Sequence, residues 1–158
     1  MKRKFVNNSH FNNQKAFTLI EALIALSITG IIYLISVPAV MNIYDYLKLN
    51  QATALFQSDL HYIREHNMMP FQNNSLSLRI YHKENYYVIL KNNKTITLTR
   101  QLPIGVNFGA VSTSTTDLTF NKLGHISNGT TLTIQSGAFK KNIVFSIGTG
   151  GIDIREVN

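Results

Sequence analysis

At 158 residues the chain has room for one domain and an anchor, but not for two full domains of on the order of 100–150 residues each. It contains no cysteine, which excludes disulfides, thiolate metal sites and cysteine nucleophiles. The formal charge is +7, but four of the 15 basic residues precede position 17, so 11 basic residues face 8 acidic ones in the rest of the chain. The surface of that part is therefore only mildly basic, which gives weak support for a polyanion partner.

Residues 1–16 are polar, rich in asparagine and free of acidic residues. They lack the apolar side chains of a core, so we predict a cytoplasmic leader. Residues 17–40 are mostly apolar and carry one charge, Glu21. As a helix at about 1.5 Å per residue they would span roughly 36 Å, more than the ~30 Å hydrocarbon core of a bilayer. The sequence therefore predicts one transmembrane helix with its N-terminus inside, because basic residues precede it.

A helical pattern continues over residues 41–69, which are predicted to form the second, amphipathic half of one long helix. Pro38 removes a backbone hydrogen bond and Gly30 is a second weak point, so we expect a kinked or locally melted helix between them. The helix is predicted to end at Met68-Met69-Pro70, because a residue before proline is disfavoured in the helical conformation.

Two apolar stripes run along this amphipathic half, on nearly opposite sides of a 3.6-residue period. One stripe contains Ile43, Tyr44, Leu47, Ala54, Leu55 and Tyr62, and the other contains Leu49, Phe56, Leu60 and Ile63. One stripe can cover a sheet of the same chain. The other then needs a second partner, such as the same helices of neighbouring subunits, unless both stripes are buried within one globule. The sequence leaves these two alternatives open.

Residues 70–158 consist of short alternating runs between turn residues, which predict an antiparallel β-domain and, with the helix, an α+β fold. The first three runs, at 76–80, 86–90 and 96–98, are joined by hairpin-sized connections that predict a three-strand meander. Residues 112–116 are expected to form a surface loop. Further strands are predicted at 118–120, 131–135, 143–147 and 152–155, with glycines between them.

The stretch Lys15-Ala16-Phe17-Thr18-Leu19-Ile20-Glu21-Ala22-Leu23 follows the basic leader and opens the apolar segment. It closely resembles the processing signal of type IV prepilins and of the pseudopilins of type II secretion and competence systems. Pro38 matches the helix-kinking proline of that family, and Ala16 stands where the family usually has glycine. The resemblance implies a pilin-like fold with a long kinked N-terminal helix, cleavage between Ala16 and Phe17 by a prepilin peptidase, and N-methylation of Phe17.

The resemblance also implies assembly into a filament whose core is made of the N-terminal helices, and there Glu21 has a role. A carboxylate inside hydrocarbon costs roughly 2.5–3.5 kcal/mol on insertion scales, so it persists where a partner offsets that cost. Cleavage would create an α-amine on Phe17, and the amine of one subunit would pair with Glu21 of its neighbour. The alternative is a membrane anchor in which Glu21 interacts with its own helix N-terminus.

The segment from Leu118 to Ile152 looks like the sheet end of minor pseudopilins of the GspH/FimT type, and a short Asn/Lys-rich chain without cysteine is most similar to their competence branch. The resemblance implies a structural subunit of a competence pilus that supports uptake of extracellular DNA and needs no cofactor. Its implied partners are the major and other minor pseudopilins, the prepilin peptidase, and the assembly membrane protein and ATPase. The implied location is the cytoplasmic membrane before assembly and the cell surface afterwards. Type II secretion or another type IV pilus is the alternative within the family.

An ordinary secretory signal is the alternative from another class, with Val37 and Ala39 as the small residues before a signal-peptidase cut. The product would be a signal-anchored or secreted binding protein or enzyme. The apolar run is longer than the usual 7–15-residue signal core, and Glu21 would weaken it. The sequence therefore disfavours this alternative.

The remaining motifs do not predict an active site. His61 and His66 are five residues apart, which does not place two metal ligands on one helical face. Gly148-Thr149-Gly150-Gly151 lacks the Lys-Ser/Thr that follows in a phosphate-binding loop. It lies between two predicted strands, so we expect a hairpin turn.

The basic residues of the β-domain fall into two groups that are candidates for DNA contact: Lys91, Lys94 and Arg100, and Lys140 with Lys141. Tyr86 and Tyr87 are nearby aromatics of the kind that stack on bases. Lysines at strand ends also keep sheet edges soluble, which explains the same residues without DNA. Of the two interpretations of these residues, solubility of the sheet edges is favoured over direct DNA binding.

Overall fold

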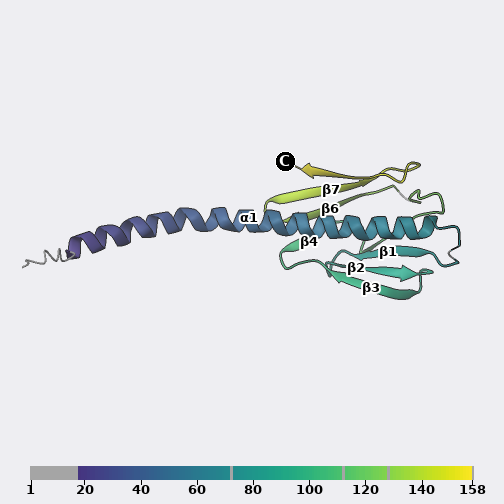
Figure 1. The fold of residues 1–158 in the computed structure, drawn as a ribbon, viewed down its shortest axis with the longest axis horizontal. Coiled ribbons are helices and arrows are strands. Elements are labelled where there is room, and N and C mark those ends of the chain that lie inside the picture. Colours follow the sequence, from purple (N-terminus) through teal and green to yellow (C-terminus); the bar gives the residue numbers. More distant parts are fainter. Residues whose placement is uncertain (1–17, 72, 112, 128, 158) are drawn as a thin grey trace, which may run out of the picture. The chain divides into compact units, whose positions relative to one another are not determined.

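The computed structural model describes residues 18–71, 73–111, 113–127 and 129–157 (Figure 1). Contacts divide the chain into two units, residues 1–38 and 39–158. The helix α1 (Leu19–Met68) contributes to both units. The leader predicted at 1–16 lies outside the described residues.

Every residue of α1 is helical, including Gly30 and Pro38. The locally melted stretch expected between them is absent, because a proline removes one hydrogen bond while the flanking turns keep theirs. A kink at Pro38 remains a prediction. The helix ends at Met68, as predicted from Pro70, and the Met69 N–H donates to the His66 carbonyl at 3.3 Å to close the last turn.

The described residues of the second unit form eight strands in two antiparallel sheets (Figure 1). The first sheet has the order β3-β2-β1-β5 and is formed by β1 (Leu76–Tyr81), β2 (Tyr86–Lys91), β3 (Thr95–Gln101) and β5 (Thr115–Thr119). The second sheet has the order β4-β6-β7-β8 and is formed by β4 (Val106–Phe108), β6 (Thr131–Ser136), β7 (Phe139–Phe145) and β8 (Ile152–Val157). The predicted α+β class, one long helix with an antiparallel β-domain, is confirmed.

The three-strand meander is confirmed, with β1 and β2 pairing from Leu76↔Lys91 to Tyr81↔Tyr86. Asn85, Asn92 and Asn93 take positive φ in its two turns, a conformation that asparagine tolerates better than most residues. The expected loop at 112–116 is partly wrong. Thr115 and Thr116 belong to β5, which extends toward the end of β1 because the His82 N–H donates to the Ser114 carbonyl at 3.1 Å.

The core of the second unit lies between one face of α1 and the two sheets. Four helix side chains on that face have no exposed surface: Leu49, Phe56, Leu60 and Ile63. The Phe56 ring lies 5.0 Å from the ring of Tyr87 in β2 and 6.1 Å from the ring of Phe108 in β4. Because these strands belong to different sheets, one helical face covers both. Each such side chain contributes roughly 1.5–3 kcal/mol of burial free energy.

A buried amide near the last turn of α1 joins the helix to the first sheet. The Asn67 Oδ1 accepts from the Leu76 N–H at 2.7 Å, and its Nδ2 donates to the carbonyls of Leu76 at 2.8 Å and Phe120 at 3.0 Å. The side chain thus satisfies three backbone groups that strand pairing leaves unpaired at this end of the sheet.

Candidate assembly surface

Glu21 lies in the first turn of α1, and its side chain is exposed. The Thr18 Oγ1 accepts from the Glu21 backbone N–H at 3.3 Å, so Thr18 caps the helix. The sequence carries a signal for this cap, a Thr followed three residues later by Glu at the start of an apolar run. An acidic residue here also favours the positive end of the helix. Ala16 and Phe17 lie outside the described residues, so the pairing of Glu21 with a Phe17 amine remains a prediction.

The apolar segment of α1 is long and hydrophobic enough to cross a membrane by length and composition. Residues 19–44 are all exposed in the structure. The three hydroxyls of Ser27, Thr29 and Ser36 each donate to the carbonyl four residues earlier at 2.8 Å. Lipid therefore would meet no unsatisfied hydroxyl among them.

The amphipathic part of α1 has one buried stripe and one exposed stripe. Ile43 and Tyr62 are 60% and 55% exposed at the two ends of the outer stripe. Tyr44, Leu47, Ala54 and Leu55 between them are also exposed. The alternative in which both stripes are buried in one globule is therefore wrong, because the sheets cover only the Leu49–Ile63 side. We call the exposed set, Ile43, Tyr44, Leu47, Ala54, Leu55 and Tyr62, the outer stripe.

These features, a capped acidic first turn followed by an exposed apolar helix, coincide with a known sequence signature. Residues 11–36 match the prokaryotic N-terminal methylation motif. The comparisons with curated proteins and with solved structures gave no match. The motif supports a type IV pilin or pseudopilin, and it indicates a structural subunit rather than an enzyme. It implies processing by a prepilin peptidase, assembly into a pilus-like complex, and a membrane anchor before assembly.

The basic residues proposed for DNA contact do not gather in one place on the second unit. Lys91 and Lys94 flank the β2–β3 turn, and both are exposed. Arg100 lies at the far end of β3, where its Nε is 3.4 Å from the Asp59 Oδ2. Lys140 and Lys141 lie in β7 of the other sheet, and the Lys141 Nζ is 3.1 Å from the Glu156 Oε1. Among the described residues, Lys91 and Lys94 form no ion pair, whereas Arg100 and Lys141 each pair with a carboxylate.

The two tyrosines considered for base stacking have different environments. Tyr87 is 1% exposed, and its hydroxyl donates to the Asp59 Oδ2 at 2.7 Å. Tyr86 lies on the other face of the sheet and stacks on Tyr81, with ring centroids 4.5 Å apart. Tyr87 thus has no free ring face, because consecutive residues of a strand point to opposite sides of the sheet.

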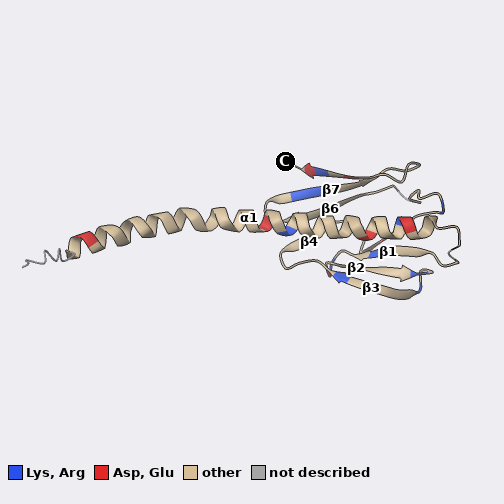
Figure 2. Ribbon diagram, viewed as in Figure 1, with Lys and Arg blue, Asp and Glu red and all other residues tan. Residues whose placement is uncertain are grey.

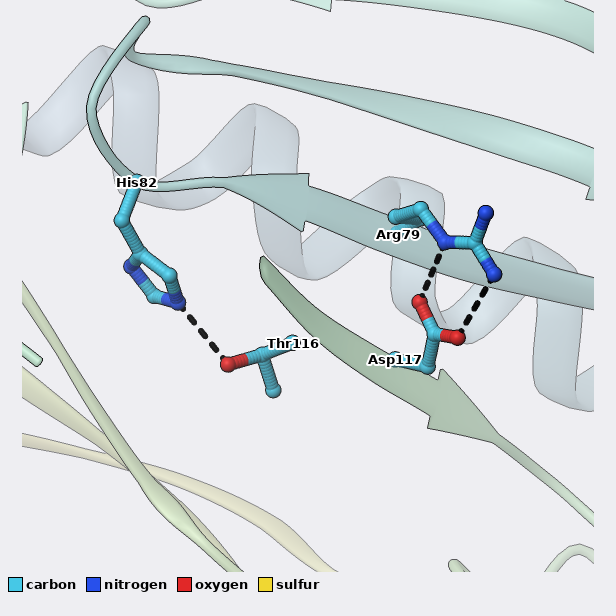
Figure 3. A network of polar contacts seen from close by, with 4 residues as sticks. All are labelled: Arg79, His82, Thr116 and Asp117. Carbon is cyan, nitrogen blue, oxygen red and sulfur yellow. Dashed lines mark hydrogen bonds and ion pairs between the residues drawn. The ribbon is translucent and has the colours of Figure 1, made fainter. Parts of the chain in front are cut away.

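A polar pair network lies across β1 and β5 (Figure 3). The Arg79 guanidinium donates to both carboxylate oxygens of Asp117, at 2.6 and 2.8 Å, and this bond raises the pKa of Arg79. The His82 Nε2 lies 2.8 Å from the Thr116 Oγ1, and burial lowers the pKa of His82 (Figure 3). Sequence reasoning missed both pairs, since their partners are more than 30 residues apart and only the strand register brings them together.

The other sequence motifs are placed as turns and helix surface. The Ser146 N–H donates to the Gly151 carbonyl at 3.0 Å across the glycine-rich segment, which confirms the predicted hairpin turn. Gly150 has φ +64°, and a Cβ there would overlap the Gly124 carbonyl oxygen, so only glycine fits. His61 and His66 are partly exposed on α1, and the described residues bring together no group of three or more potential metal ligands.

Proposed function

We propose that this protein is a minor pseudopilin, a structural subunit of a competence pilus that supports uptake of extracellular DNA. The methylation motif supports the pseudopilin part of the proposal. The competence part rests on the short, Asn/Lys-rich, cysteine-free chain, which is most like the ComGD pseudopilins. The subunit acts by assembly and catalyses no reaction.

The observation that carries this proposal is the exposed Glu21 carboxylate in the otherwise uncharged apolar segment at the start of α1. Figure 2 shows it as the isolated acidic position at the start of α1. From Thr18 to Tyr44, Glu21 is the one charged residue. Removal of the leader after Ala16 leaves a cationic, N-methylated amine on Phe17. In a staggered bundle this amine meets Glu21 of a neighbour, and exclusion of water strengthens their attraction.

The outer stripe completes the assembly surface in this proposal. It leaves apolar helix surface exposed on the second unit, and the helices of the major and other minor pseudopilins cover it in the filament. Before assembly the subunit spans the cytoplasmic membrane with its N-terminus inside. A prepilin peptidase processes it there, and the assembly membrane protein and its ATPase move it into the pilus at the cell envelope.

The test compares Glu21→Ala with Glu65→Ala, which removes an exposed carboxylate from the other end of α1. We expect both variants to insert into the membrane and only Glu21→Ala to lose incorporation into sheared pilus fractions. Normal incorporation of Glu21→Ala would overturn the proposed pairing.

Two alternatives are separated from this proposal by simple observations. A subunit of type II secretion or of another type IV pilus shares the same helix, and the neighbouring genes distinguish it from a competence subunit. A signal-anchored secreted binding protein or enzyme would have a different mature end. Sequencing the mature N-terminus gives Phe17 for a pseudopilin and Val40 for a secreted protein.

A further inference from the structure

A polar pocket of about 450 Å³ lies beside the C-terminal end of α1, between the helix-to-β1 connection, the β2–β3 turn and the segment that follows β5. Its described lining residues are Asn67, Asn73, Asn74, Ser75, Asn92, Phe120, Asn121 and Lys122. Most of them are asparagines. They come from four separate parts of the chain, so no single sequence motif predicts the pocket.

The hydrogen bonds of these asparagines leave donors in excess. The Asn92 Oδ1 accepts from the Ser75 N–H at 3.0 Å, and the Asn92 Nδ2 donates to the Asn74 Oδ1 at 3.0 Å. The Asn121 Oδ1 accepts from the N–H groups of Leu123 and His125, at 3.0 and 2.9 Å. Backbone donors fix these amide orientations. The amide oxygens of Asn74, Asn92 and Asn121 are thus occupied, and the NH₂ groups of Asn74 and Asn121 have no partner among the described residues.

The charges around the pocket are also of one sign. Lys122 lines it and is exposed, and the described lining includes no carboxylate. Lys91 and Lys94 flank Asn92 in the β2–β3 turn and extend the positive charge beyond the pocket (Figure 2). Amide and ammonium donors without a carboxylate beside them in the described lining favour an anion. Three lysines spread over a turn and a pocket suit a polymer of repeated charges better than a single small ion.

We propose that this pocket binds a backbone phosphate of a DNA strand. The phosphodiester oxygens accept from the amides of Asn74 and Asn121 and from the Lys122 ammonium, while Lys91 and Lys94 contact adjacent phosphates. A single strand is the form whose backbone bends most readily into a concave site. This inference rests on the proposed function, and it assigns to this subunit a direct contact with the DNA that the pilus takes up.

The test measures binding of a fluorescent single-stranded oligonucleotide of about 20 nucleotides to the full chain in detergent micelles, by anisotropy at two salt concentrations. The variants are Lys122→Gln and the double change Lys91→Gln with Lys94→Gln. Lys83→Gln is the matched control, because it removes one exposed charge from the β1–β2 turn, at the opposite end of these strands from Lys91. We expect roughly a five- to tenfold loss of affinity for Lys122→Gln, a salt slope reduced by about 1 per lysine removed, and no change for the control.

Three results would overturn the proposal: no oligonucleotide binding at low salt, an equal loss in the Lys83→Gln control, or binding of inorganic phosphate without binding of the oligonucleotide. These results leave the proposed function standing, since pilus incorporation does not depend on the pocket. Conversely, normal incorporation of Glu21→Ala counts against the proposed assembly and leaves the binding measurement unaffected.

Discussion

The Tyr87 hydroxyl donates a 2.7 Å hydrogen bond to the Asp59 carboxylate and so joins the second strand of the first sheet to the helix that covers it. Both side chains are nearly buried. Burial, together with the adjacent carboxylate, raises the pKa of Tyr87, so the hydroxyl stays protonated and remains a donor. The carboxylate has a second partner in the Arg100 guanidinium, 3.4 Å away at the edge of the sheet.

Replacing Tyr87 by Phe keeps the ring that packs on Phe56 and removes only the hydroxyl. We expect a loss of about 1.5–3 kcal/mol in the free energy of unfolding, because the buried Asp59 carboxylate loses its best donor. Urea denaturation of the full chain in detergent measures this. Tyr86→Phe on the opposite face of the sheet is the control, and equal stability of both variants would show that the Tyr87 bond makes no net contribution.

Replacing Asn67 by Ala removes three hydrogen bonds at once. The Leu76 N–H and the carbonyls of Leu76 and Phe120 are then left in a buried site, which costs roughly 1–3 kcal/mol for each group that water does not reach. We expect a clear drop in stability and faster amide exchange at the start of β1. Asn73→Ala, in the exposed connection after the helix, should change neither quantity. Unchanged exchange in Asn67→Ala would show that the Asn67 hydrogen bonds do not stabilise the start of β1.

Acid should destabilise the second unit through His82. Burial lowers its folded-state pKa below the usual 6.5, so the unfolded chain binds more protons as the pH falls. The contribution of neutral, buried His82 to the free energy of unfolding is therefore fully present above about pH 6.5 and is lost progressively below it. His82→Asn should flatten the difference between unfolding midpoints at about pH 7.5 and pH 5.5, where most carboxylates are still ionised. If His82→Asn keeps the wild-type difference between the two unfolding midpoints, titratable groups other than His82 cause the loss of stability in acid.

The sequence was a good guide wherever a local period determines the structure. Alternation predicted β1 and β3, an apolar run predicted β2, and the position of Pro70 predicted the end of α1. Val106, Asn107 and Phe108 were missed as a strand, because a three-residue run between two glycines has too few alternations to be recognised.

The candidate site was predictable only in part for a related reason. The two helix stripes were visible in the sequence, but both are apolar, and only the placement of the sheets decides which one is buried. Likewise, the pleat of a strand sends Tyr86 and Tyr87 to opposite faces, but only the placement of the helix decides that Tyr87 is the buried one. The asparagine pocket depends on contacts between distant segments, such as Ser75 with Asn92, which no local pattern encodes.

The outer stripe should be dispensable for folding and necessary for assembly. Leu47 is 50% exposed and lies in the middle of this stripe, so Leu47→Gln removes little buried surface. Its effect on the unfolding free energy should be within about 0.5 kcal/mol, as is usual at exposed positions. In the proposed filament, however, neighbouring helices would cover the same position, and a buried amide without a partner is unfavourable there. We therefore expect Leu47→Gln to reach the membrane at normal levels and to be depleted from sheared pili, whereas Ser58→Gln, at an exposed polar position of the same helix, should be incorporated normally. Normal incorporation of Leu47→Gln would show that this face of the helix stays in solvent after assembly.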